Sequence, residues 1–519
     1  MNIKASRHAA AKSYFQRRRR VNPQNYDYLF LSLAVWLSLI LYVRGLGFYL
    51  DDWNFLAVFT NSSHKSLLGL SRSIYSAQPW ARMRPVQLLN LAGLYWVFGL
   101  NPLGYHITNA VVLNVTVLLF YQTLLMLGQP RLLALTAPLV YALLPNYSTD
   151  RFWVAAFQAN LSLALYFASF SLDLRALRRP PARFWSWKLL SVSCLLGSVL
   201  AYEVTLPLFL LNLLVVWYRS HPLGCTRADS RVPKSTLVAS SLVMLSGLVM
   251  VTAFKVLMTE RANTEAGVVN LLTSNIRRLL DFNYRYYDGI YGLNLKQAVA
   301  VNYVSYGFGL PRVVWRVLNK YFDWSTLIMS AVLGLVVFAY PYYVIKRQGI
   351  ELPGKGYWLK VIFLGLVVFA LGYAIFLATT DIRLETTDHS NRTNIAAAVG
   401  VALTLVGGIG FASGLIPPGF PRRIFFCVTV TLLCMGGCLI INTLAGFWAA
   451  AYNREKEILC DVRHNFPNLP SGSSLIVDGF CPARARQWSL DTVGTCRARC
   501  KPYIVITAYE PPSFPRDWM

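Results

Sequence analysis

Long apolar runs, separated by short polar or basic stretches, are the feature that most limits how this chain can fold. Of its 519 residues, 55% are hydrophobic, and the mean hydropathy is +0.44. These values are typical of a membrane protein and not of a water-soluble one. Inside a bilayer the backbone must satisfy its own hydrogen bonds, which helices do within one segment. The sequence therefore predicts an all-α polytopic membrane protein.

Basic residues set the direction of each span, because Lys and Arg gather in the short loops on the cytoplasmic side. A tail over residues 1–27 contains the run Arg17 to Arg20 and is predicted to be cytoplasmic. The loop after the fourth span carries five cations: Arg175, Arg178, Arg179, Arg183 and Lys188. If both stretches face the cytoplasm, the net charge of +26 reflects topology and anionic lipid, not nucleic acid.

With this direction, residues 28–450 form a transmembrane region of about eleven helices. The predicted spans cover residues 28–43, 105–127, 132–144, 154–172, 189–201, 204–217, 237–258, 327–345, 361–378, 395–415 and 425–448. The predicted outer loops are 50–104, 146–152, 259–325 and 379–394. The apolar segment Val86 to Phe98 is too short to cross at about 1.5 Å per residue, so we expect it to lie on the outer leaflet as an interfacial helix.

The C-terminal residues 451–519 are predicted to form a small extracytoplasmic α/β region, with a helix over 452–463 and a strand over 474–478. Its cysteines allow up to two disulfides in an oxidising compartment. We expect the pair Cys496 and Cys500 to join Cys460 and Cys481. The cysteines within apolar spans, which we expect to be packing residues, are Cys194, Cys427, Cys434 and Cys438.

Two adjacent carboxylates follow the first span, in the stretch Gly45 to Phe55. These are Asp51 and Asp52, and a carboxylate near hydrocarbon is costly unless it is paired, hydrated or used. The pair is therefore a candidate functional site. The alternative is a hydrated loop start in which Asp caps a short interfacial helix.

The order of motifs around this loop resembles a known family. Asp51-Asp52-Trp53 follows the first helix, Arg84-Pro85 opens an amphipathic helix, and the run Gly99 to His106 comes next. This order resembles the C-superfamily of membrane glycosyltransferases, in particular the protein O-mannosyltransferase-like branch, whose enzymes use polyprenyl-phosphate sugars. The resemblance covers roughly residues 28–220 and returns near Asn391-Arg392.

The resemblance implies transfer of a sugar from a polyprenyl-phosphate donor to an extracytoplasmic acceptor, with inversion. In related enzymes an acidic residue of the first outer loop is the general base, which here corresponds to Asp51, with Asp52 as its neighbour. Asp150 falls where the family has a second acidic group, although Leu-Pro and Thr-Asp replace the usual His-Pro and Thr-Glu. A salt bridge to Arg151 or a helix cap is the alternative role for Asp150.

Cations for the donor phosphate are needed on the same face, because guanidinium groups bind phosphate oxygens as a fork. The candidates are Arg84, Arg392, His106 and Arg82. For Arg82 and His106, snorkelling or a packing hydrogen bond is the alternative. Glu203 is a supporting residue in a Tyr-Glu pair that resembles the family's Lys-Glu. The change of Lys to Tyr202 leaves open whether a phosphate contact is lost or supplied elsewhere.

The expected partners are the lipid-linked donor, membrane lipids and an unidentified protein, lipid or glycan acceptor, with no nucleic acid. No cofactor is firmly implied, and a divalent metal has no supporting ligand pattern. The expected location is the cell membrane, as a multi-pass protein of the bacterial inner membrane type, with the active site on the extracytoplasmic face. Two other hypotheses remain: a polysaccharide ligase or polymerase that uses the loop 259–323, and a lipid-linked saccharide flippase, which would need more charge within the spans.

Overall fold

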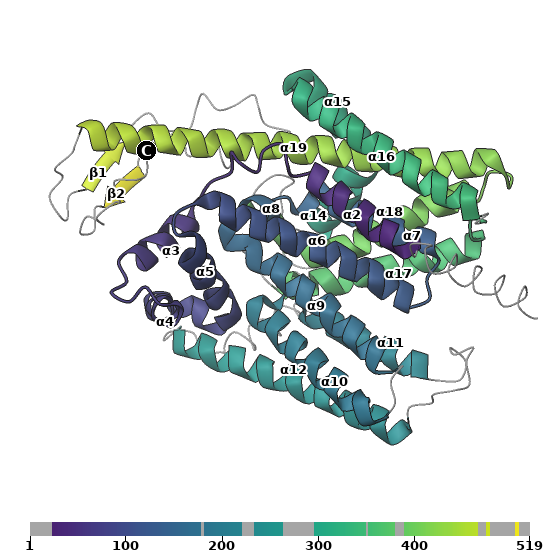
Figure 1. Cartoon of the computed structure of the whole chain (residues 1–519), viewed down its shortest axis with the longest axis horizontal. Coiled ribbons are helices and arrows are strands. Elements are labelled where there is room, and N and C mark those ends of the chain that lie inside the picture. Colours follow the sequence, from purple (N-terminus) through teal and green to yellow (C-terminus); the bar gives the residue numbers. More distant parts are fainter. Residues whose placement is uncertain are drawn as a thin grey trace, which may run out of the picture.

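A computed structural model describes residues 23–177, 181–220, 233–262, 295–348, 351–378, 389–465, 474–477 and 504–507. Almost all of these residues are helical, and eight of the helices are long and apolar enough to cross a membrane. The structure thus confirms the prediction of an all-α multi-pass membrane protein. Figure 1 shows the longest helix, α19, extending along the whole bundle.

The eight long helices each coincide with a predicted span. They are α6 (Pro102–Met126), α9 (Phe157–Ala176), α10 (Pro181–Ala201), α12 (Lys234–Ala262), α16 (Trp324–Gln348), α17 (Lys355–Tyr373), α18 (Ile395–Ser413) and α19 (Phe420–Asn465). The other three predicted spans fall on shorter helices: α2 (Pro23–Leu37), α7 (Arg131–Leu143) and α11 (Leu206–Ser220). The count of eleven crossings therefore stays a prediction.

Helix α7 shows why a short helix suffices in this bundle. Its 13 residues span about 20 Å, less than the hydrocarbon core of a bilayer. All of its residues from Leu132 to Leu143 are buried, and it packs against α6, α18 and α19. Because protein surrounds it, its length need not match the bilayer. Its end meets α19 closely, since a Cβ added to Gly437 would lie 2.0 Å from the carbonyl oxygen of Leu143.

A small helical region lies at one end of the bundle and contains the acidic loop, the stretch Gly45 to Phe55 with Asp51 and Asp52. It consists of α3 (Asp51–Thr60), α4 (Leu67–Ala77), η1 (Pro79–Met83) and α5 (Pro85–Phe98). These helices share a hydrophobic core of their own, to which Phe48, Phe55 and Leu91 contribute. In Figure 1 they lie at the same end as the strands. Helix α5 has the short length that the sequence predicts for the interfacial helix, and its position at the bilayer surface stays a prediction.

Helix α19 continues well past the predicted span 425–448. The predicted helix over 452–463 is the end of this same element. Beyond it, β1 (Ser474–Val477) coincides with the predicted strand and pairs antiparallel with β2 (Ile504–Thr507). Cys460 is exposed on α19, whereas Cys481, Cys496 and Cys500 lie outside the described residues, so the predicted disulfides stay a prediction. In the apolar spans Cys427, Cys434 and Cys438 are buried, and Cys194 is half-buried.

The interval predicted as a long outer loop contains helices that pack into the bundle. They are α14 (Leu295–Val299), the π-helix η8 (Ala300–Phe308) and α15 (Leu310–Lys320). The Tyr303 hydroxyl donates to Thr404 Oγ1 of α18 at 3.4 Å. Beyond α15, the Tyr321 ring contacts Phe447 of α19. This part of the interval is therefore built against α18 and α19.

Several charges of the predicted cytoplasmic side are paired inside the protein. Lys188 Nζ donates to Asp173 Oδ1 at 2.8 Å, and both side chains are buried. Lys188 is therefore neutralised internally, whereas Arg183 of the same basic stretch is exposed. Asp27, the last residue of the predicted tail, is buried within α2 and accepts hydrogen bonds from Arg131 Nε at 2.7 Å and the Tyr121 hydroxyl at 2.5 Å. Helix α2 begins at Pro23, five residues before the predicted span, and the boundary of the cytoplasmic tail stays a prediction.

Candidate active site

Asparagine side chains hold the backbone of the loop between α7 and α9. This loop contains η2 (Pro145–Tyr147) and α8 (Thr149–Phe152). Asn109 of α6 and Asn160 of α9 both donate to the carbonyl oxygen of Asp150, at 2.9 and 2.7 Å. The Thr149 N–H donates to Asn391 Oδ1 at 3.1 Å. Three separate elements therefore fix the position of Asp150.

The carboxyl group of Asp150, unlike its backbone carbonyl group, has no hydrogen-bond partner among the described residues. It is fully buried, and neither of its oxygens accepts a hydrogen bond from any residue that the structure describes. Burial raises the pKa of Asp150 well above its usual range, against the opposing effect of Arg392 and Arg151. A buried polar group of this kind calls for an explanation, and a role in binding or catalysis is one.

The alternative of a salt bridge between Asp150 and Arg151 has no support in the geometry. Arg151 Nη2 donates to the Ala142 carbonyl oxygen at 2.7 Å and to the Tyr147 hydroxyl at 2.9 Å. Its guanidinium group also lies over the Tyr147 ring, 4.7 Å from the centroid. Arg151 therefore ties the loop back to the end of α7, and its charge acts on Asp150 only at a distance.

Arg392 connects this loop to the first acidic loop. It belongs to η10 (His389–Asn394), immediately before α18, and its guanidinium group lies 4.8 Å from the centroid of the Trp153 ring. Trp153 Nε1 in turn donates to the carbonyl oxygen of Tyr49 at 3.1 Å. A cation, an indole ring and the backbone just before Asp51 thus form a continuous chain of contacts.

The two adjacent aspartates occupy different environments. Asp51 is exposed as the first residue of α3. Asp52 is buried, and its two carboxylate oxygens accept hydrogen bonds from the backbone N–H groups of Tyr49 at 2.9 Å and Ala155 at 2.8 Å. Burial raises the pKa of Asp52, and backbone hydrogen bonds oppose this shift. Asp52 therefore fastens α3 to the Asp150 loop, whereas the Asp51 carboxylate is exposed.

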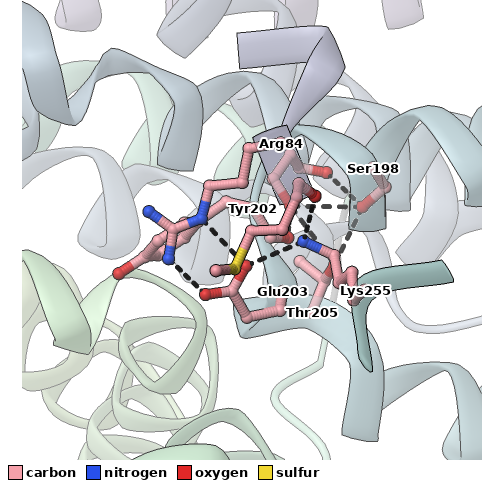
Figure 2. A network of polar contacts seen from close by, with 8 residues as sticks. Arg84, Ser198, Tyr202, Glu203, Thr205 and Lys255 are labelled. Atoms are coloured by element: carbon pink, nitrogen blue, oxygen red, sulfur yellow. Dashed lines mark hydrogen bonds and ion pairs between the residues drawn. The ribbon is translucent and has the colours of Figure 1, made fainter. Parts of the chain in front are cut away.

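A second charged cluster joins α5, α10, α11 and α12. Figure 2 shows Arg84 and Lys255 approaching Glu203 from two directions. Arg84 Nε donates to Glu203 Oε2 at 3.1 Å, its Nη2 donates to Oε1, and Lys255 Nζ donates to Oε2 at 3.0 Å. Burial alone would raise the pKa of Glu203, but Arg84 and Lys255 hold it below its ordinary value. Glu203 is therefore an ionised anchor for two cations.

The turn that carries Glu203 is held rigidly. It is η4 (Glu203–Thr205), between α10 and α11, and it confirms the break that the sequence predicts at Tyr202-Glu203. Ser162 Oγ donates to the Tyr202 carbonyl oxygen at 2.8 Å, and Ser198 Oγ lies 2.8 Å from Thr205 Oγ1. The Ser162 hydroxyl thus satisfies a backbone carbonyl group where the helix is interrupted. Figure 2 shows Ser198 beside Thr205 at this turn.

Tyr202 lies between the two clusters. Its ring is covered by the Arg84 guanidinium group, 4.6 Å from the centroid. Burial raises the pKa of Tyr202, and the charges of Arg84, Glu203, Arg392 and Asp150 all act on its hydroxyl group. Tyr202 is therefore within electrostatic range of charges from both the Glu203 cluster and the Asp150 loop.

Lys255 was not recognised from the sequence. It is the only charged residue within the predicted span 237–258, and that isolation is the signal that could have found it. It stands beside Glu203, so a lysine is present next to this carboxylate although Tyr202 occupies the position where the family has lysine. Whether a phosphate contact is supplied here stays an open question.

Two of the predicted phosphate ligands, Arg82 and His106, make hydrogen bonds to backbone carbonyl groups. Arg82 Nε donates to the carbonyl oxygen of Tyr75 at 2.9 Å and closes the turn between α4 and η1. His106 is buried, and its Nε2 donates to the Gly47 carbonyl oxygen at 2.9 Å. Neither bonds to the Glu203 cluster in the described part of the chain, and their role as phosphate ligands stays a prediction.

The described residues thus place two cations on Glu203, a third cation, Arg392, beside Trp153, and a buried carboxyl group at Asp150. Within the described residues no group of three or more His, Cys, Asp or Glu side chains could hold a metal ion. No protein-family model matches the chain, and no curated protein is significantly similar to it in sequence.

Proposed function

We propose that this protein is an integral membrane glycosyltransferase that moves a sugar from a polyprenyl-phosphate donor to an extracytoplasmic acceptor with inversion. The observation that carries the proposal is one connected site that contains an exposed carboxylate, a buried unbonded carboxyl group and three cations. The site lies where the helices leave the bundle, at the end that we assign to the extracytoplasmic face of the cell membrane. That position suits a donor whose phosphate stays at the bilayer surface.

The donor phosphate would be held by Arg84, Lys255 and Arg392. Arginine offers a planar fork to phosphate oxygens, and lysine offers a compact charge. Glu203 neutralises part of the charge of Arg84 and Lys255 and keeps both in place before the donor binds. As the bond between the anomeric carbon and phosphate breaks, these cations stabilise the charge on the departing phosphate.

The acceptor would be activated by Asp51. Its carboxylate takes the proton of the acceptor hydroxyl while the oxygen attacks the anomeric carbon opposite the phosphate. A new carbon–oxygen bond forms, the phosphate leaves with the bonding electrons, and the configuration inverts. Asp150 supplies two unbonded oxygens in a fixed position, which suits hydrogen bonds from the hydroxyl groups of the transferred sugar. The proposal assigns no step to a metal or cofactor.

The decisive test combines glycoconjugate analysis with one isosteric variant. Mass analysis of glycoconjugates from cells with and without the gene should show a sugar that depends on the protein. Asp51→Asn should abolish that sugar or leave at most about one per cent of the rate, because a general base contributes about 10²–10⁴-fold.

The matched control is Asp461→Asn, which alters an exposed aspartate of α19 away from the site and should keep full activity. Both variants should reach the membrane in the same amount. An Asp51→Asn protein that transfers sugar at nearly the wild-type rate would refute the assignment of the base.

One observation keeps a polysaccharide ligase or polymerase as the second candidate. Asn302 of η8 donates to Asn394 Oδ1 at 3.0 Å, and Asn394 donates to the Asn146 carbonyl oxygen at 3.0 Å. The interval 295–308 thus contacts the base of the site next to Arg392. Loss of activity in Asn302→Ala with retention in Asp51→Asn would favour the ligase.

A further inference from the structure

The backbone immediately before Asp51 has a conformation that leucine rarely adopts. Leu50 has a φ of 50° and a ψ of −116°, and it is the only non-glycine residue with a positive φ in the part of the chain that the structure describes. The Asp52 N–H donates to the carbonyl oxygen of Tyr49 at 3.0 Å, three residues back, which closes a β-turn. The Leu50 angles lie close to those of the first central position of a type II′ turn, which glycine usually occupies.

The side chain of Leu50 does little to offset this strain. It is 53% exposed, so it gains only part of the stabilisation that a leucine gains in the core. A non-glycine residue with such angles persists only where the surrounding structure fixes it, and residues of this kind gather at functional sites. The contacts that keep Leu50 in this conformation must therefore come from its neighbours.

Tyr49, on one side of Leu50, is fixed by its side chain and by its backbone. Its hydroxyl group accepts a hydrogen bond from the Gly47 N–H at 3.0 Å and donates to the carbonyl oxygen of Trp448 in α19 at 2.9 Å. Its ring packs edge-on against the Trp448 ring, with 4.7 Å between the centroids. Its carbonyl oxygen also accepts from Trp153 Nε1 at 3.1 Å.

The other side of the turn is fixed by Asp52. Its carboxylate oxygens accept from the N–H groups of Tyr49 and Ala155, at 2.9 and 2.8 Å. Leu50 therefore cannot rotate to an ordinary negative φ unless one of these anchors gives way. The Tyr49 hydroxyl group is the anchor that joins the turn to α19, and phenylalanine removes it while keeping the ring.

We propose that Tyr49 is a positioning residue, which holds the strained turn at Leu50 and thereby fixes the position of the Asp51 carboxylate. This inference rests on the proposed function, in which Asp51 is the general base. While the Tyr49 hydroxyl group is bonded to Trp448, Leu50 keeps its glycine-like conformation. Without that bond the turn relaxes, and Asp51 moves from the place where it meets the acceptor hydroxyl group.

The test is a rescue experiment on the full-length protein in cells. It measures how fast the protein-dependent sugar appears in glycoconjugates, per amount of protein in the membrane. Tyr49→Phe should lower this rate about tenfold or more, because a displacement of about 1 Å can cost about 10²-fold. Tyr49→Phe/Leu50→Gly should recover most of the rate, since glycine adopts the turn without strain. Tyr49→Phe/Leu50→Ala should not recover, because alanine keeps the Cβ and the strain.

Melting temperatures test the strain without any measurement of activity. Leu50→Gly should melt about 1 °C or more above Leu50→Ala, because the glycine variant loses the strain. Leu89 is the matched control, since it is 49% exposed and lies within α5. In an ordinary helix alanine is the more stable of the two residues, so Leu89→Gly should melt below Leu89→Ala.

Each part of the inference can fail separately. A Tyr49→Phe protein with wild-type activity, or equal rescue by Leu50→Ala and Leu50→Gly, would overturn the positioning role. Leu50→Gly melting below Leu50→Ala would show that the turn is not strained. A wild type that adds no sugar would instead refute the proposed function and the positioning role with it, and the melting temperatures would still decide whether the turn is strained.

Discussion

Asp51 and Asp52 show that adjacent identical residues can have different tasks. Both oxygens of Asp52 accept backbone hydrogen bonds, so its carboxylate is committed to holding α3 against residues 153–155. Asp51, in contrast, is exposed at the start of α3. In the proposed reaction the general base must be a free group on a fixed support, and these two residues would supply both parts.

This difference predicts distinct effects of the two amide substitutions. In Asp52→Asn, an amide NH2 group replaces one of the two oxygens that accept backbone hydrogen bonds, so one backbone N–H loses its acceptor. The substitution should therefore destabilise the fold by about 1–3 kcal/mol and lower the melting temperature. Asp51→Asn should leave the melting temperature unchanged. Thermal unfolding of both purified variants in detergent measures the difference. Equal melting temperatures would show that Asp52 does not fasten α3.

The Glu203 cluster predicts a stability that depends on pH. The pKa of Glu203 is lowered in the folded protein, so the stability from its pairing with Arg84 and Lys255 is present above the ordinary glutamate value. It is lost as the pH falls below that value toward the lower folded-state pKa.

Glu203→Gln should therefore destabilise the protein at neutral pH, by at most about 3 kcal/mol because the pair is partly exposed. The difference from wild type should shrink as the pH is lowered below about 4.5. Melting temperatures across this pH range provide the measurement. A difference that stays constant with pH would mean that the charge of Glu203 is not what stabilises the cluster.

At the scale of elements, close contact between α17 and α18 positions Arg392. A Cβ on Gly400 would lie 2.2 Å from the backbone nitrogen of Phe369, and one on Gly372 would lie 2.6 Å from that of Ala397. Small residues let the two backbones approach this closely, as in many membrane helix pairs. Because η10 leads directly into α18, this packing sets where the Arg392 guanidinium group lies.

Gly400→Ala should therefore push α17 and α18 apart and destabilise the protein by about 1–3 kcal/mol. Donor binding should weaken with it, since Arg392 moves. Gly408→Ala is the matched control on the same helix, because a Cβ there meets no atom within 4 Å. Thermal unfolding compares the two variants. Equal stability of the two would contradict the close packing described here.

At the scale of the whole molecule, the alternation of basic loops predicts which end of the bundle faces the cytoplasm. A reporter fused after Arg179 should be active as a cytoplasmic fusion, and one fused after Gly472 as an extracytoplasmic fusion. A phosphatase and fluorescent-protein reporter pair measures both. Finding the two fusion points on one side would show that a span has been miscounted, and would move the proposed site to another face.

The sequence alone determined the helical class, most of the spans and the breaks between them. Hydropathy and charge report how each segment interacts with its solvent, so α18 and the turn at Glu203 were predictable from their own residues. The position of Asp51 at the start of a short helix could be predicted for the same reason. These features depend on residues that are near one another in the chain.

Only the tertiary structure decided which side chains meet. Lys255 reaches Glu203 because α12 packs beside α10, and α15 lies along α19 although its sequence reads as part of a polar loop. Asparagines from α6 and α9 bond to the backbone carbonyl oxygen of Asp150, while its buried carboxyl group has no hydrogen-bond partner among the described residues. Such contacts join residues far apart in the chain, and they depend on helix packing that the hydropathy of a single segment does not encode.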